Sequence, residues 1–105
     1  MAKKYTLMSA VTTDTNGSDV EINSRSADLI LEVYGTGTFT VKIQVKASDG
    51  STYIDVRDLD RNVINVTSNE RLPVFLEYGA TVRAVTSGTS GASVNVNLIK
   101  AGENR

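Results

Sequence analysis

The sequence lacks cysteine, histidine and tryptophan, and has a single proline in 105 residues. Without cysteine there are no disulfides, thiolate metal sites or thiol nucleophiles, and without histidine there are no imidazole bases or imidazole-ligated metals. Eleven lysine and arginine residues against twelve aspartate and glutamate residues give a formal net charge of −1. No broad attraction to nucleic acid or to an anionic membrane follows from that balance. We therefore expect no cofactor, no nucleic-acid partner and no membrane partner.

Targeting signals and long apolar runs are also missing. The first ten residues contain two lysines but not the apolar run of roughly 7–15 residues that a secretory signal needs. No stretch approaches the roughly 18 apolar residues of a membrane helix. The length suits one compact domain over residues 1–105, with short polar tails at about 1–4 and 101–105.

What the sequence does contain is a strand pattern. Valine, isoleucine and threonine, which suit a pleated surface, make up 31 of the 105 residues. The clearest strand covers residues 38–47, where Phe39, Val41 and Ile43 alternate with polar residues. This alternation predicts one buried face and one solvent-facing face. Shorter stretches of the same kind are residues 5–11, 20–22, 29–34, 52–57, 63–67, 74–78, 81–86 and 94–99.

Turn-forming residues separate these stretches. They occur at residues 15–18, 34–37, 48–51, 68–71, 78–80 and 87–91. Asn16-Gly17 and Asp49-Gly50 are the strongest hairpin signals because both pairs tolerate positive φ, and Pro73 fits a strand start or edge. The spacing predicts an all-β fold, a single antiparallel β-sandwich of jelly-roll type with about seven to nine short strands.

The densest group of charges lies at residues 55–61. Asp55, Asp58 and Asp60 could together bind a calcium ion, because hard cations take several oxygen ligands. The spacing does not match an EF-hand loop, and Arg57 and Arg61 neutralise two of the three charges locally. We prefer to interpret this group as a solvated strand end with weak ion pairs, each worth about 0–1 kcal/mol. A calcium site and a catalytic carboxylate pair are the alternatives.

Enzymatic chemistry has little support elsewhere in the sequence. No carboxylate stands in the apolar context that general-acid catalysis requires, and the five lysines lie in the tails or on the polar faces of strands. A carbohydrate-binding module is a more serious alternative, because small β-sandwiches stack sugars on aromatic rings. Tyrosines in such folds are nevertheless more often half-buried packing residues.

One stretch resembles a known group of proteins. Residues 37–53, a strand that runs through Phe39 and Val41 into the Asp49-Gly50 turn, resemble a recurring segment of small tailed-phage structural proteins. Residues 72–75 and 82–88 resemble the next two strands of that group, and residues 92–98 resemble its closing strand. The resemblance covers roughly residues 29–99. Tyr53 stands where the group commonly has tryptophan.

The group includes capsid decoration (cement) proteins and other head-accessory proteins, which are often trimeric. The resemblance implies a non-enzymatic virion protein, made in the host cytoplasm, that binds the major capsid protein or other virion proteins as a homo-oligomer, with a trimer favoured. The alternatives are a carbohydrate- or receptor-binding module of a tail or baseplate, and a head–tail joining or tail-tube protein. Candidate partner contacts are Lys3, Lys4, Tyr5, Arg57, Arg61 and Arg71.

Overall fold

A computed structural model describes residues 4–23 and 28–100, which form six strands and no helix. The strands are β1 (Lys4–Val11), β2 (Val20–Glu21), β3 (Asp28–Lys46), β4 (Tyr53–Asp55), β5 (Glu70–Phe75) and β6 (Thr81–Lys100). Every pairing between them is antiparallel, and all belong to one sheet. The predicted all-β antiparallel fold is therefore confirmed. Within the described residues, no helix is long and apolar enough to span a membrane.

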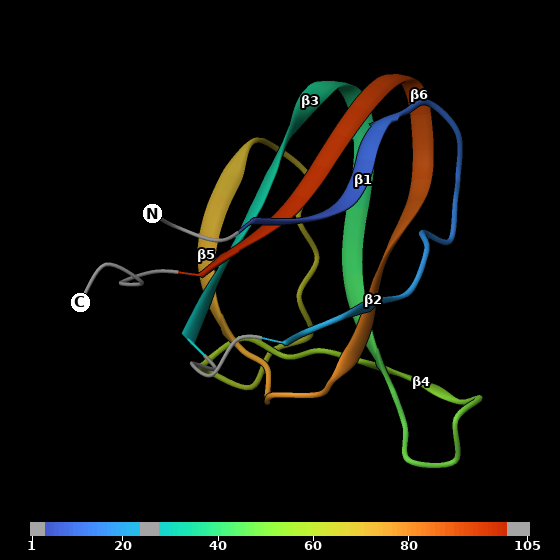
Figure 1. The fold of residues 1–105 in the computed structure, drawn as a ribbon. Coiled ribbons are helices and arrows are strands. Elements are labelled where there is room, and N and C mark those ends of the chain that lie inside the picture. The colour runs from blue at the N-terminus through green and yellow to red at the C-terminus, as the bar shows by residue number, and fades with distance from the viewer. Residues whose placement is uncertain (1–3, 24–27, 101–105) are drawn as a thin grey trace.

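Two long strands form the spine of the molecule. β3 has 19 residues and β6 has 20, and they pair from Leu29 opposite Lys100 to Val45 opposite Val82. Each of these two strands bends sharply near its middle, as Figure 1 shows. The bend divides the sheet into two halves. The β5 half has the order β1-β6-β3-β5, and the β4 half has the order β2-β6-β3-β4.

Glycines make the bend possible. The pairing of β3 with β6 shifts register between Thr36 and Thr38. Gly37 there has φ of 80°, and a Cβ on it would overlap the carbonyl group of Gly91. A Cβ on Gly35 would overlap the carbonyl oxygen of Ser93 in the same way. Only glycine lets the two backbones come this close.

The bend explains why the strands are fewer and longer than predicted. Residues 34–37 and 87–91 were expected to be turns between separate strands, yet both lie inside continuous strands. Each of these two pairs of predicted short strands is therefore one bent strand. The predicted strand at residues 63–67 forms only isolated bridges, so the sheet has six strands rather than seven to nine. A glycine-rich turn and a glycine-rich bend look the same in the local sequence. The long-range pairing of β3 with β6 decides between them.

The two predicted hairpin turns have different outcomes. Asp49-Gly50 does join β3 to β4: Gly50 has φ of 79°, and the Ala47 amide donates to the Thr52 carbonyl at 2.7 Å. Asn16-Gly17 is not a hairpin turn. The Gly17 amide donates to the Ala84 carbonyl on β6 at 2.7 Å, so this segment runs alongside the sheet edge.

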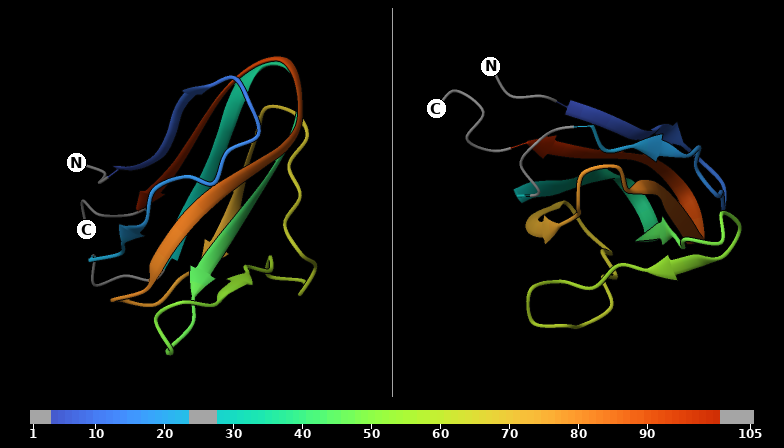
Figure 2. Two further views of the ribbon diagram at one scale, coloured as in Figure 1. Left: turned by 90° about the vertical axis from the view of Figure 1, so that its right-hand side faces the viewer. Right: turned by 60° about the horizontal axis from the view of Figure 1, so that its bottom comes forward.

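A single hydrophobic core lies between the two halves, which stand one in front of the other in the left view of Figure 2. Alternate residues of the long strands supply it. The core residues of β3 and β6 are Leu29, Leu31, Val33, Phe39, Val41, Ile43, Val82, Ala84, Ala92, Val94, Val96 and Leu98. The prediction of a buried face for residues 38–47 is confirmed at Phe39, Val41 and Ile43. The intervening residues of each half form two outer faces, where partners can reach the protein.

Candidate interaction surfaces

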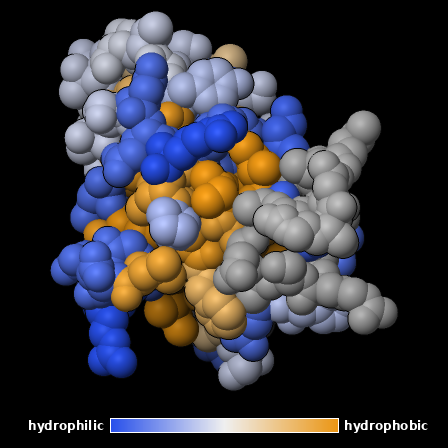
Figure 3. Space-filling view, turned by 90° about the vertical axis from the view of Figure 1, so that its left-hand side faces the viewer, coloured by the Kyte–Doolittle hydropathy of each residue, from blue (hydrophilic) through white to orange (hydrophobic). Residues whose placement is uncertain are grey.

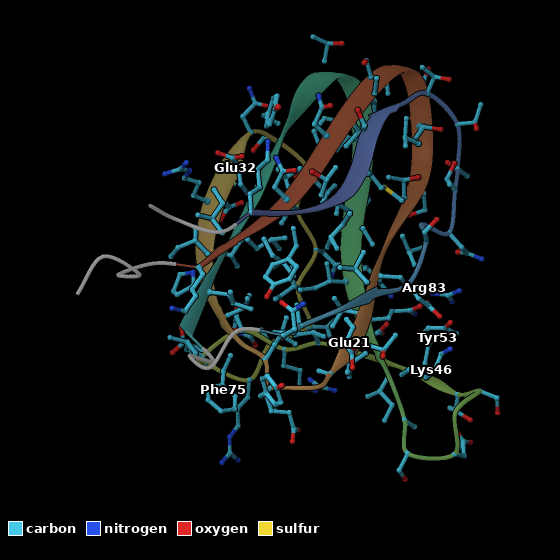
Figure 4. All side chains as sticks on the ribbon, in the orientation of Figure 1. Glu21, Glu32, Lys46, Tyr53, Phe75 and Arg83 are labelled. Carbon is cyan, nitrogen blue, oxygen red and sulfur yellow. The ribbon has the colours of Figure 1, made fainter. Side chains whose placement is uncertain are left out.

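Paired polar side chains cover the outer face of the β4 half. The Arg83 guanidinium carbon lies 3.6 Å from the centroid of the Tyr53 ring. The Tyr53 hydroxyl donates to Asp19 Oδ1 at 2.8 Å, and Lys46 Nζ lies 2.8 Å from Asp19 Oδ2. Figure 4 shows Arg83, Tyr53 and Lys46 together, on the other side of the view from Glu32 and Phe75. These four side chains form the core of what we name the Tyr53 network.

The strand register extends the network across the sheet. Gln44 on β3 lies opposite both Asp55 on β4 and Arg83 on β6. Arg83 Nε donates to Gln44 Oε1 at 3.0 Å, and Gln44 Nε2 donates to Asp55 Oδ1 at 3.0 Å. Lys42 Nζ lies 3.4 Å from Asp55 Oδ2. The charged and polar side chains of this face therefore form hydrogen bonds and ion pairs with one another across adjacent strands.

These contacts shift the pKa values of some of the side chains that make them. The hydrogen bond from Lys46, followed by that from Tyr53, lowers the pKa of Asp19, and Asp19 raises the pKa of Lys46. The hydrogen bond from Gln44, aided by Lys42, lowers the pKa of Asp55. Each shift favours the charged form, so the network stays ionised at neutral pH.

The outer face of the β5 half has a smaller polar group. Arg71 on β5 donates to Glu32 Oε2 from Nη2 at 2.8 Å and from Nε at 3.0 Å. The buried Asn97 side chain donates to Glu32 Oε1 at 3.0 Å. The hydrogen bond from Arg71, and then that from Asn97, lowers the pKa of Glu32. The positive charge of Lys4 also helps to lower it.

Apolar side chains lie beside this group on the same face. Ile30 on β3 is opposite Pro73 on β5 and Ile99 on β6. Phe75, two residues after Pro73 on β5, has 62% of its surface exposed. Ile30, Pro73, Phe75 and Ile99 are named the Phe75 patch below. Figure 3, which views the molecule from the side of β5, shows hydrophobic surface there, with hydrophilic residues above it and to its left.

A groove adjoins the Phe75 patch. It has a volume of about 420 Å³ and lies between β5 and the turn at residues 58–60. Its apolar wall includes Leu59, which is 65% exposed. The residues that line this β5 groove are Asp58, Leu59, Asp60, Glu70, Leu72 and Pro73. The patch and the groove together form a continuous surface around β5.

The structure does not bring the three candidate calcium ligands together. Asp55 belongs to the Tyr53 network, whereas Asp58 Oδ1 accepts the backbone amides of Asp60 and Asn62 at 2.9 and 3.0 Å. Among residues 4–23 and 28–100, no three acidic side chains are grouped so that they could hold a metal ion. Asp58 thus acts as a turn-forming side chain, which is a common use of aspartate in loops.

The predicted basic contacts fall into two separate groups. Lys4 is exposed at the start of β1 and acts on Glu32, to which the exposed Arg71 is bonded. Arg57 and Arg61 are both exposed at the turn after β4, where Arg57 Nη1 donates to the Arg61 carbonyl at 3.0 Å.

Tyr5 is a correction to the prediction. Its side chain is only 6% exposed, so it is a core residue and presents no ring to a partner. Its hydroxyl donates to Asn23 Oδ1 at 3.0 Å and accepts the Asn23 amide at 3.1 Å. The remaining candidate, Lys3, lies outside the described residues.

Phe75 was not among the predicted contact residues, although the sequence contains a signal for its exposure. Val74, Phe75 and Leu76 are three consecutive apolar residues at the start of the predicted strand 74–78. Because strand side chains alternate between faces, such a run must expose its middle residue if the outer two are buried. Val74 and Leu76 are 2% and 4% exposed, and Phe75 is the outward member.

The tyrosines that remain exposed are Tyr34 and Tyr78. Tyr34 lies on β3 close to the bend, whereas Tyr78 lies in the turn between β5 and β6. Tyr78 is 66% exposed and lines an open groove of about 340 Å³. The other lining residues are Val45, Lys46, Ser48, Glu77, Gly79 and Ala80.

No family model and no curated protein matches this sequence. Among solved structures, the chain is similar to the SPBc2 prophage-derived protein YomS, with a TM-score of 0.70 and 12% sequence identity. The match covers 95% of this chain and 94% of the YomS chain. At this identity the likeness concerns the fold, so the two proteins share a β architecture over almost their whole lengths.

Proposed function

We propose that this chain is a non-enzymatic structural protein of a phage virion, acting as a homo-oligomeric capsid decoration or head-accessory protein, with a trimer favoured. The observation that carries the proposal is the fold match to a prophage-derived protein over 95% of this chain. The resemblance of residues 37–53, 72–75, 82–88 and 92–98 to small tailed-phage structural proteins points the same way. We place the protein in the virion, after synthesis in the host cytoplasm.

The surfaces of the molecule suit this role. A decoration protein works through shape and contact, and here an exposed apolar patch lies next to a groove on one side of the sheet. The net charge of −1 allows many copies to pack densely without strong mutual repulsion. By bridging neighbouring coat subunits, each copy would oppose their separation and so raise the force or temperature at which the head ruptures.

The direct test is co-sedimentation with capsids of the encoding phage that were prepared without this protein. Binding at micromolar concentration, together with a higher temperature of capsid rupture, is the expected result. No binding at that concentration would contradict the proposal. The number of copies bound per coat subunit also separates decoration from a head–tail joining or tail-tube role, in which a single ring would bind at one vertex or along the tail.

One observation favours a second candidate, a carbohydrate-binding module of a tail or baseplate. The groove at Tyr78 combines an exposed aromatic ring with the hydroxyl of Ser48 and the carboxylate of Glu77. Rings of this kind stack on sugars, and flanking polar groups bond to sugar hydroxyls. A glycan array checks this function: binding that Tyr78→Ala abolishes and Tyr34→Ala leaves intact would support it, and an array without hits would remove it.

A further inference from the structure

We propose that the Phe75 patch and the β5 groove form the surface through which copies of this chain bind one another. The inference rests on the proposed homo-oligomeric virion protein, but the contact it names pairs two copies about a two-fold axis and so predicts a dimer rather than the favoured trimer. The occupant is a second copy of this chain. Three features point to this contact: the exposed apolar side chains, the charges on either side of them and the strand edge on which they lie.

The apolar part of the surface holds two strongly exposed side chains that a third apolar residue connects. Phe75 and Leu59 are 62% and 65% exposed, and Pro73 connects them because it belongs to both the patch and the groove. Contiguous exposed apolar surface on a soluble protein usually marks a contact with another molecule. Aromatic side chains are also the ones that most often supply the binding energy of an interface.

The charges around the apolar part are of opposite sign on opposite sides. Lys4 lies on β1, directly opposite Ile99 in the strand register, and is exposed. Asp60 and Glu70 line the groove beyond β5, and neither carboxylate has a hydrogen-bond or ion-pair partner among the described residues. From β1 to the groove beyond β5, this row of the sheet therefore presents first a cation, then apolar residues and finally the two unpaired carboxylates.

This arrangement is complementary to itself. When two such surfaces face each other, the apolar centres meet and the Lys4 side of one copy can lie over the acidic side of the other. A partner with a single sign of charge would match only one flank. Pro73 has no amide hydrogen to donate, which disfavours pairing through the edge of β5. We therefore assign the contact to the side chains of this face.

Sedimentation velocity of the purified chain, followed over a range of micromolar concentrations, tests the assignment. We expect the wild-type protein to form an oligomer and Phe75→Asp to be monomeric, with association weakened by at least about tenfold because a charge replaces an apolar anchor. The matched control is Ile54→Asp, since Ile54 is 52% exposed but lies on β4. It should assemble as the wild type does. Circular dichroism confirms that both variants are folded.

Charge reversal tests the identity of the occupant. Lys4→Glu alone, or Asp60→Lys with Glu70→Lys, should each weaken self-association. A mixture of the two proteins should recover it, because the reversed flanks complement each other. Recovery in the mixture supports a second copy as the occupant, whereas no recovery contradicts it.

The outcomes separate this inference from the proposed function. A wild-type protein that stays monomeric but co-sediments with capsids overturns the inference and supports the proposed function. An oligomer that Phe75→Asp dissociates, but that never binds capsids, supports the inference and contradicts the function. If Phe75→Asp stays oligomeric and loses capsid binding, the coat protein is the occupant and the inference is wrong.

Discussion

The two outer faces of the folded sheet differ in how they use the same residue types. On the β4 half, an aromatic ring is covered: Tyr53 lies beneath Arg83 and bonds to Asp19. On the β5 half, the aromatic ring of Phe75 is 62% exposed, and no cation is found over it among the described residues. Among the described residues, the aromatic ring of one face is covered by other side chains and that of the other face is not.

This difference indicates which face carries function. A network of paired side chains fixes the register of three neighbouring strands, β4, β3 and β6, and leaves few groups to offer a partner. An exposed apolar patch does not stabilise the folded monomer. It contributes favourable free energy only when another molecule covers it and removes it from water. We therefore propose that the β4 half mainly stabilises the fold and that self-association uses the β5 half.

Breaking the bend between the halves should have the largest effect on stability. Gly37→Ala combines a φ of 80° with overlap against the Gly91 carbonyl, and should lower the free energy of unfolding by ~3 kcal/mol. Gly50→Ala is the control, because Gly50 has φ of 79° but no atom within 4 Å of its added Cβ. It should cost only about 1 kcal/mol. Urea unfolding measures both, and equal losses would contradict the role of the bend.

A buried hydroxyl holds the long segment after β1 against the β4 half. Thr86 is 2% exposed; its Oγ accepts the Thr15 amide at 2.9 Å and contacts the Thr13 carbonyl at 3.2 Å. Thr86→Val should cost ~1–3 kcal/mol of unfolding free energy because it leaves the Thr15 amide without its acceptor. Thr81→Val, elsewhere on β6, is the comparison and should change stability far less. Similar losses for the two variants would show that the hydroxyl is unimportant.

The two aromatic sites should separate stability from assembly. Arg83→Met removes the cation over Tyr53 and should cost ~0.5–1 kcal/mol without changing the oligomer. Phe75→Ser should change the stability of the monomer by less than ~0.5 kcal/mol, because its ring is largely exposed, yet it should weaken association. Urea unfolding of dilute protein and sedimentation velocity together test this. If Arg83→Met weakened association and Phe75→Ser lowered the stability of the monomer, our comparison of the two faces would be contradicted.

Acid should have the smallest effect, through the hairpin at Asp49. The Thr52 hydroxyl, with the amides of Thr52 and Ser51, lowers the pKa of Asp49 from 3.8 to about 2. Because the folded pKa lies below the unfolded one, the carboxylate adds stability above pH 3.8 that disappears as the pH falls towards 2. Asp49→Asn should therefore flatten the loss of stability over this range. An unchanged slope in thermal unfolding at several pH values would contradict this.

The sequence alone was sufficient for the local features of the fold. Alternation placed Phe39, Val41 and Ile43 in the core correctly, and the Asp49-Gly50 pair identified a real hairpin. Both depend on the side-chain period of a strand and on the backbone preference of a dipeptide, which are properties of adjacent residues.

Features that depend on distant pairing were missed. Gly35 and Gly37 look like a turn until β6 is placed beside them. Tyr5 looks like a terminal contact until Asn23, 18 residues away, supplies the partner of its hydroxyl. The covering of Tyr53 by Arg83 likewise joins β4 to β6. None of these contacts has a signature within a window of the sequence.

Hydroxyl-radical footprinting of the assembled protein tests most directly whether the β5 half is the binding face. Phe75, Ile54 and Tyr78 are 62%, 52% and 66% exposed in the single chain, so all three side chains should react readily when the protein is dilute. On assembly we predict that oxidation of Phe75 falls several-fold, while oxidation of Ile54 and Tyr78 stays the same. Protection of Ile54 with Phe75 still reactive would contradict the assignment of binding to the β5 half.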